Sequence, residues 1–181
     1  MDSEESIVKA AAQGETKAFE LLVKKYQRYV YFLSMRMVGS ETLADDITQR
    51  AFMKAYRALS KFEFRSSFKT WLSVITLNLC RTELAKKKRI QVEVPEGLSD
   101  DSEEKQEAYE DLAHQRYYLK QALEHLPARQ KEVVILRIYQ EKTFKDIASM
   151  LESSESAVKV NFHYAMKSLR EWVKKRDLSH E

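Results

Sequence analysis

The clearest local pattern in the chain runs from Thr143 to Arg170 and reads TFKDIASMLESSESAVKVNFHYAMKSLR. Apolar residues recur at helical spacing in its first part, pause at a short polar turn at 152–154, and recur again in a longer segment. In that segment one stripe is expected to be buried, formed by Val158, Phe162, Ala165 and Leu169. Two helices joined in this way are typical of a helix-turn-helix, whose second helix enters the major groove of duplex DNA.

The face opposite the apolar stripe carries polar and basic side chains. Donors to base edges are predicted to be Lys159, Asn161 and His163. Contacts to phosphates are predicted for Lys145, Lys167 and Arg170. An ordinary helical hairpin with a polar outer face is the alternative structural explanation.

The rest of the chain also favours helices, because apolar residues recur every three or four positions and glycine and proline are rare. Gly14 and Gly39 are expected to end helices, and Pro127 to lie in the first turn of one. The predicted helices are 3–13, 16–38, 42–59, 67–88, 109–125, a segment from Pro127, 143–151, and a last helix from 153 or 154 to about 175. We therefore predict an all-α fold with two small helical domains.

Charge divides the chain into three parts. The net charge of +3 conceals a balance of +7 over residues 1–89, −8 over 90–111, and +4 over 112–181. The acidic part contains Pro95 and Gly97 and little that is apolar, so we interpret 90–111 as a flexible linker between domains at 1–89 and 112–181. Two basic blocks indicate a polyanionic partner.

The helix predicted at 67–88 combines aromatic and basic side chains, and the preceding loop adds Phe62, Phe64 and Arg65. Aromatic rings with neighbouring cations can stack on unpaired bases and hold their backbone. Trp71 is expected either in the domain core or at the surface as a wedge. Asn78 lies two helical turns beyond Trp71, so both can share one face.

Several functions are excluded by composition. One cysteine excludes a disulfide framework and fits a reducing cytoplasm, and Cys80 is predicted to be a buried structural thiol. The longest uncharged stretch, 70–80, is too short to span a membrane, and the acidic N-terminus lacks the basic region of a signal peptide. The histidines are scattered, so neither a cofactor, a metal site nor a catalytic triad is expected, and the protein is predicted not to be an enzyme.

These segments together resemble an extracytoplasmic-function (ECF, group 4) RNA polymerase sigma factor, over nearly the whole chain. GETKAFELL at 14–22 resembles the family's opening helix, and ADDITQRAF at 44–52 resembles its polymerase-binding helix. YRAL at 56–59, FKTWL at 68–72 and Asn78 resemble its promoter-opening segment. The family's C-terminal helix-turn-helix has its counterpart in residues that resemble it here: Leu126-Pro127, Ile147-Ala148, Leu151 and Ala157-Val158-Lys159.

The resemblance implies that the protein binds the clamp and flap of core RNA polymerase and directs promoter recognition and DNA melting, in a stress or envelope response. Clamp binding would use Asp45, Asp46, Gln49, Phe52 and Met53. Melting of the "−10" element, as single strands, would use Phe64, Arg65, Lys69, Thr70, Trp71, Asn78 and Arg81. Recognition of the duplex "−35" element would use Lys145, Glu155, Ser156, Lys159, Val160, Asn161, His163 and Lys167.

Further family properties follow from the same resemblance. The linker would thread towards the polymerase active site, and an anti-sigma factor commonly holds members of the family inactive. Two departures stand out: Arg50 replaces the usual Glu after Gln49, and expected arginines of the last helix are Asn161, Tyr164 and Met166. Because phosphate contacts dominate affinity, these losses predict weaker or altered "−35" binding.

Two other function classes compete with this interpretation. A stand-alone helix-turn-helix regulator would bind duplex DNA as a dimer, and co-elution with core RNA polymerase would distinguish it from a sigma factor. A nuclease would need a cluster of carboxylates suited to metal ions, which the sequence pattern lacks.

Overall fold

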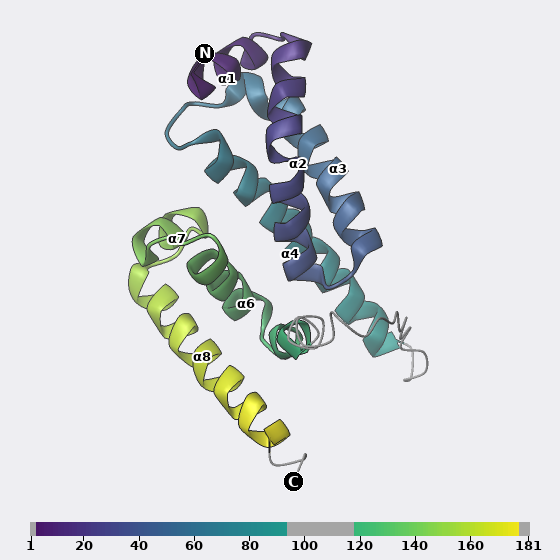
Figure 1. Ribbon diagram of the computed structural model, residues 1–181, viewed down its shortest axis with the longest axis vertical. Coiled ribbons are helices and arrows are strands. Elements are labelled where there is room, and N and C mark those ends of the chain that lie inside the picture. Colours follow the sequence, from purple (N-terminus) through teal and green to yellow (C-terminus); the bar gives the residue numbers. More distant parts are fainter. Residues whose placement is uncertain (1–2, 94–117, 178–181) are drawn as a thin grey trace, which may run out of the picture.

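The computed structural model describes residues 3–93 and 118–177, and the regular structure in these ranges is helical (Figure 1). The elements are α1 (Glu4–Ala12), α2 (Thr16–Val38), α3 (Glu41–Ala58), η1 (Leu59–Lys61), α4 (Phe68–Glu93), a helical segment at 118–124, α6 (Ala128–Val134), η2 (Ile135–Tyr139), α7 (Phe144–Met150) and α8 (Glu155–Asp177). The predicted all-α fold class is confirmed.

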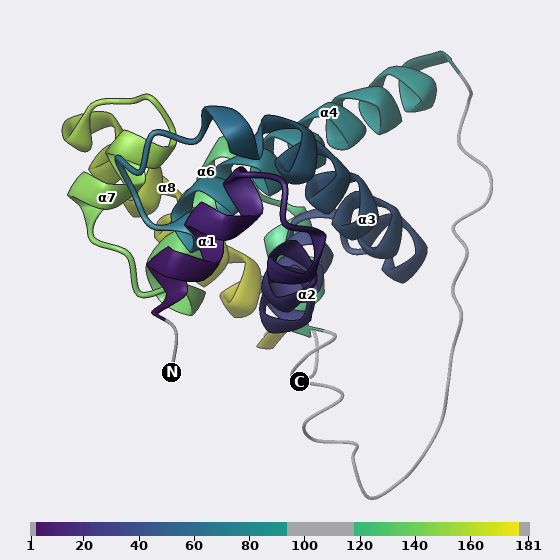
Figure 2. The ribbon, with the colours of Figure 1, turned by 90° about the horizontal axis from the view of Figure 1, so that it is seen from above.

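Helices α1 to α4 form an N-terminal bundle in which α2 packs against each of the other three (Figures 1 and 2). Leu22, Val30, Leu33 and Met37 recur along the inner side of α2 and are almost fully buried. Burying such side chains stabilises a fold by about 1.5–3 kcal/mol each. The apolar stripe of α2, visible in the sequence, therefore stabilises the bundle.

Local chemistry sets the helix ends in this bundle. Ser3 and Ser40 accept hydrogen bonds from backbone amides in the first turns of α1 and α3. Gly39 ends α2 in the left-handed region with φ of 71°, which glycine adopts without steric cost. The predicted helix at 16–38 has the predicted ends, whereas α4 continues to Glu93, beyond the predicted end at residue 88.

The C-terminal helices form a second unit with the predicted helix-turn-helix. Thr143 begins α7 through a capping box, in which its hydroxyl and the Asp146 carboxylate each bond the other's backbone amide. Ser154 accepts from the amide of Ala157 at the start of α8. Pro127 is the N-cap of α6 rather than a residue of its first turn, because its ψ of 143° is extended.

The predicted linker lies mostly outside the described residues, and so does the predicted start of a helix near Tyr109. Residues 90–93, which the charge pattern assigned to the linker, instead belong to the end of α4. Within the described ranges, none of the helices has the length and apolar character needed to cross a bilayer.

The two helical units share apolar contacts. One buried cluster includes Leu72 and Leu77 of α4 together with Ile135, Leu136 and Ile147 of the second unit. Cys80 is fully buried, as predicted, and burial raises the pKa of its thiol to about 12. Such a thiol stays protonated and inert at neutral pH.

Candidate nucleic-acid interface

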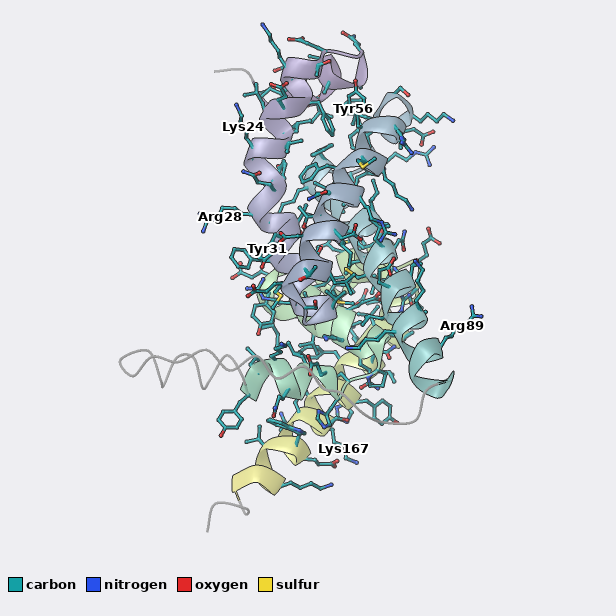
Figure 3. The ribbon with its side chains drawn as sticks, turned by 90° about the vertical axis from the view of Figure 1, so that its right-hand side faces the viewer. Lys24, Arg28, Tyr31, Tyr56, Arg89 and Lys167 are labelled. Carbon is teal, nitrogen blue, oxygen red and sulfur yellow. The ribbon has the colours of Figure 1, made fainter. Side chains whose placement is uncertain are left out.

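The outer face of α8 is open to solvent. Exposed residues on it include Ser156, Lys159, Val160, His163 and Lys167, and Lys167 extends from the helix in Figure 3. On the inner side Val158 and Ala165 are buried, while Phe162 packs partly buried against Phe144 of α7 with ring centroids 5.5 Å apart. The predicted stripe thus fixes the helix so that its basic face points outward.

Two of the predicted base-reading residues already have partners on α8. The Lys159 ammonium lies 2.7 Å from the Glu155 carboxylate. The Asn161 amide donates to the carbonyl of Ala157 at 2.8 Å and is half-buried, so one of its two N–H donors is used within the helix. Lys159 is exposed and can exchange its partner for DNA, since exposed ion pairs contribute little.

A second exposed face lies on α3. Asp45, Asp46 and Gln49 are exposed there, and Met53 is 54% accessible. Phe52 does not belong to this face: it is 7% accessible, and its ring packs edge-on against Phe19 at 6.4 Å. The predicted apolar anchor at Phe52 is therefore a core residue, and Met53 supplies the exposed apolar surface.

Arg50, the departure from the family pattern, joins α3 to α4. Its guanidinium lies 2.8 Å from the Asp46 carboxylate and 2.8 Å from that of Glu83. The hydrogen bonds to Asp46 and Glu83 raise the pKa of Arg50 above its usual range. Arg50 thus partly neutralises the acidic face at Asp46 and links α3 to α4 through Glu83.

The loop before α4 and the start of that helix form an aromatic cluster. Trp71 is half-buried, with its ring centroid 5.0 Å from that of Phe62 and 5.8 Å from that of Phe68. Phe64 is 41% accessible and has a φ of 56°, which is uncommon outside glycine. Trp71 was expected either in the core or at the surface. Its half-buried ring does both, because part of it packs on Phe62 and Phe68 and part is accessible to solvent.

The remaining "−10" candidates lie in different environments. Asn78 and Arg65 are exposed, and Arg65 pairs with Glu63 at 2.8 Å. Lys69 places its ammonium 4.4 Å from the centroid of Tyr29. Further cations project into solvent from the outer side of α2, where Figure 3 shows Lys24 and Arg28.

Thr70 and Arg81 meet the second helical unit. The Lys142 ammonium donates to the Thr70 hydroxyl at 3.5 Å, and Arg81 Nε lies 2.5 Å from Glu132 Oε1. Sequence reasoning did not assign Lys142 or Glu132. The available signal was a glutamate directly before the apolar run VVIL at 133–136, where a buried charge needs a partner.

In the described ranges, histidine, cysteine, aspartate and glutamate nowhere gather in a group of three or more that could hold a metal ion. What the site offers is binding surface: an exposed acidic and apolar face on α3, an aromatic and cationic edge on α4, and a basic recognition helix. A helical bundle joined to a helix-turn-helix unit with these surfaces defines a class, the two-domain helical DNA-binding transcription factor.

Comparison with known proteins narrows this class. Residues 22–90 match the Sigma-70 region 2 family, and residues 116–169 match Sigma-70, region 4. The chain is 28% identical to RNA polymerase sigma-H factor of Pseudomonas aeruginosa, covering 93% of this chain and 92% of that relative. It is 29% identical to ECF RNA polymerase sigma factor SigW of Bacillus subtilis, covering 94% and 96%. The chain belongs to the ECF sigma factors of RNA polymerase.

Solved structures show the same fold. CnrH, in complex with the cytosolic domain of CnrY, superposes with a TM-score of 0.71 at 23% identity, covering 96% of this chain and 99% of that chain. RpoE of Bartonella quintana, in complex with the anti-sigma factor NepR, gives a TM-score of 0.66 at 21% identity, covering 87% and 98%.

Proposed function

We propose that this sigma factor divides its work among three surfaces. The α3 face binds the clamp of core RNA polymerase, the aromatic edge of α4 opens the "−10" element, and α8 reads the "−35" element as duplex. The domain roles follow the predicted division at 1–89 and 112–181. The observation that carries the proposal is the outward basic face of α8 in a chain whose two units both match sigma factor regions.

The polymerase-binding part rests on exposed residues at helical spacing. Asp46, Gln49 and Met53 follow one another at steps of three and four, so they share a side of α3. An exposed apolar side chain with a polar rim is the usual anatomy of a protein interface. Phe52 is left out of this surface and supports it from the core.

The DNA-binding part combines two weak contacts. Trp71 and Phe64 offer partly exposed aromatic surface on which unpaired bases can stack. Each stacked base contributes about 1–3 kcal/mol of binding free energy. Lys159 and its neighbours on α8 offer duplex contacts. When both units are held on polymerase, the second contact becomes intramolecular and gains effective concentration.

Promoter opening of this kind needs binding free energy and no bond chemistry in the chain itself, so we propose that the protein is not an enzyme. Because sigma factors act with the transcription machinery, we propose that the protein works in the cytoplasm. The family assignment disfavours the stand-alone regulator, which would act without polymerase. An anti-sigma factor is a proposed partner, since RpoE of Bartonella quintana was solved with one.

Run-off transcription tests the proposal. Core RNA polymerase with the purified chain, on the DNA upstream of its own gene, is expected to yield a discrete transcript that core enzyme alone does not. Gel filtration of the same mixture should show co-elution. Failure to co-elute would contradict the proposal, and a free homodimer on duplex DNA would support the regulator.

The recognition helix has its own matched pair of variants. Lys159→Ala should weaken "−35" recognition by about 1–3 kcal/mol if this lysine contacts a base edge. Lys174→Ala removes another exposed lysine, near the other end of α8, and should change "−35" recognition little. Transcription from templates with intact and scrambled upstream elements measures the difference, and equal effects of the two variants would argue against base reading by Lys159.

A further inference from the structure

The outward face of α8 has an apolar side chain at its centre. Exposed residues line this side of the helix at steps of four, three and four: Ser156, Val160, His163 and Lys167. Val160 follows the buried Val158 by two residues, which is a rotation of about 200° around the helix axis. Its side chain therefore points away from the core, into the space that a bound duplex would occupy.

Tyr164 extends this apolar surface by one helical turn. It follows Val160 at a step of four, and the two side chains are 55% and 52% accessible. The Tyr164 ring lies beside that of His163, with centroids 5.9 Å apart. Valine is a weaker helix former than lysine or glutamate, so helix propensity does not explain an exposed valine here. The pair is better explained as a surface that a partner covers.

Positive charge surrounds this apolar centre. Lys159 and Lys167 are exposed before and after Val160 along α8, and Lys145 is exposed on α7. Figure 3 shows how far Lys167 extends from the helix. Ammonium groups at the rim suit the phosphates that border a groove, which leaves the middle of the groove to the apolar pair. The arrangement therefore favours duplex DNA as the partner.

The base chemistry that fits the apolar pair is the methyl group of thymine. In the major groove thymine presents its C5-methyl to apolar side chains, whereas guanine presents two acceptors that arginine reads. Position 164 carries tyrosine where the resembled family has arginine, so a guanine-reading group is missing there. Asn161 could read adenine, but it is half-buried and bonded to the carbonyl of Ala157.

We propose that Val160 and Tyr164 contact thymine methyl groups in the "−35" element, and that this pair makes the sigma factor select A·T pairs there. The inference rests on the proposed function, because it requires α8 to lie in the major groove. The two residues are about 6 Å apart along the helix, and successive base pairs are about 3.4 Å apart. The selected A·T pairs are therefore expected within about two base-pair steps of each other.

The first test lets the holoenzyme choose its element. Templates carry the DNA upstream of the gene with its upstream element randomised, and the templates that holoenzyme retains are sequenced. We expect A·T enrichment at two nearby positions. Tyr164→Arg should shift one of them towards G·C by about tenfold, because arginine reads guanine. An element without A·T enrichment, or one that Tyr164→Arg leaves unchanged, would overturn the proposal.

A matched pair of valine variants accompanies this selection. Val160→Ser should lose the A·T preference at one position, and serine has a helix propensity similar to that of valine, so the fold is kept. Val173→Ser is the control, since Val173 is 48% accessible on the same helix but lies outside the outward line of Val160. Equal changes of preference in both variants would overturn the assignment to Val160.

The second test removes the methyl groups alone. Deoxyuridine in place of thymidine keeps the pairing with adenine and deletes only the C5-methyl. The affinity of the parent holoenzyme should fall about fourfold for each methyl group removed at a selected position. In Val160→Ser, the replacement at one of these positions should have little further effect, because the contact is already lost. Equal affinity for thymine and uracil templates at every selected position would overturn the proposal.

These tests separate base reading from the proposed function. If the chain forms no holoenzyme, or if the holoenzyme ignores the upstream element, both are wrong. If the upstream element matters but the methyl groups do not, only the reading by Val160 and Tyr164 is wrong. If Val160→Ser weakens binding of core polymerase and leaves the base preference unchanged, the apolar pair is a protein contact and the inference is again wrong.

Discussion

Helices α3 and α4 belong to one bundle, yet their outer faces differ in how much they are exposed to solvent. The acidic and apolar face of α3, with Asp46 and Met53, is open to solvent. The side of α4 with Thr70 and Arg81 is engaged by the C-terminal unit. Two helices of one small bundle therefore differ in accessibility: the α3 face is exposed, whereas this side of α4 contacts the C-terminal unit.

The largest expected effect comes from the core beneath both faces. Leu72 is fully buried on α4. Leu72→Ala should lower the free energy of unfolding by about 2–5 kcal/mol, because it leaves a cavity as well as losing apolar burial. Val74→Ala, at a half-buried position on the engaged side, should cost less. Denaturant unfolding measures both, and equal losses would mean that the engaged side is packed as tightly as the core.

The open face of α3 gives the next prediction. Met53→Asp should weaken binding of core RNA polymerase by about 2–4 kcal/mol if Met53 is an interface anchor. Leu21→Asp on α2 is the matched control, since Leu21 is 52% accessible and Met53 54%. Affinity for labelled core enzyme is the measurement. Similar losses of affinity in both variants would argue against the α3 face as the polymerase-binding surface.

The aromatic edge of α4 should respond in a different assay. Trp71→Ala is expected to spare polymerase binding and to reduce promoter opening by about 1–3 kcal/mol, the value of one stacked base. Trp71→Phe keeps an aromatic ring beside Phe62 and Phe68 and should retain most of the opening. Permanganate reactivity of the melted strand reports this, and an unchanged pattern in Trp71→Ala would count against the role.

The smallest effect is expected at the start of α7. Thr143→Ala should cost about 1 kcal/mol of stability, because the N-cap hydroxyl is lost. The hydrogen bond from Thr143 lowers the pKa of Asp146 below its ordinary 3.8, so this contribution is present above that pH and lost as pH falls below it. The difference between parent and variant should therefore shrink in acid. A difference that grows in acid would show that the capping box is not its source.

Much of the architecture could be predicted from the chain alone. The ends of α2 and the capping of α7 by Thr143 follow from residues within a few positions of one another. The buried positions of Val158 and Ala165 follow from periodicity in the same way. Phe52 and Met53 show where this reasoning stopped, because both are apolar neighbours on α3 and were both expected at the surface, whereas Phe52 is buried and packs against Phe19.

Local spacing and backbone chemistry are enough to predict which segments are helical, where glycine and serine bound them, and which family the motifs resemble. The contacts of Arg81 with Glu132, of Arg36 with Tyr139, and of Arg50 with two helices could not be predicted in this way. Such pairs join residues far apart along the chain. Their meeting depends on how whole helices pack, which periodicity within one helix does not specify.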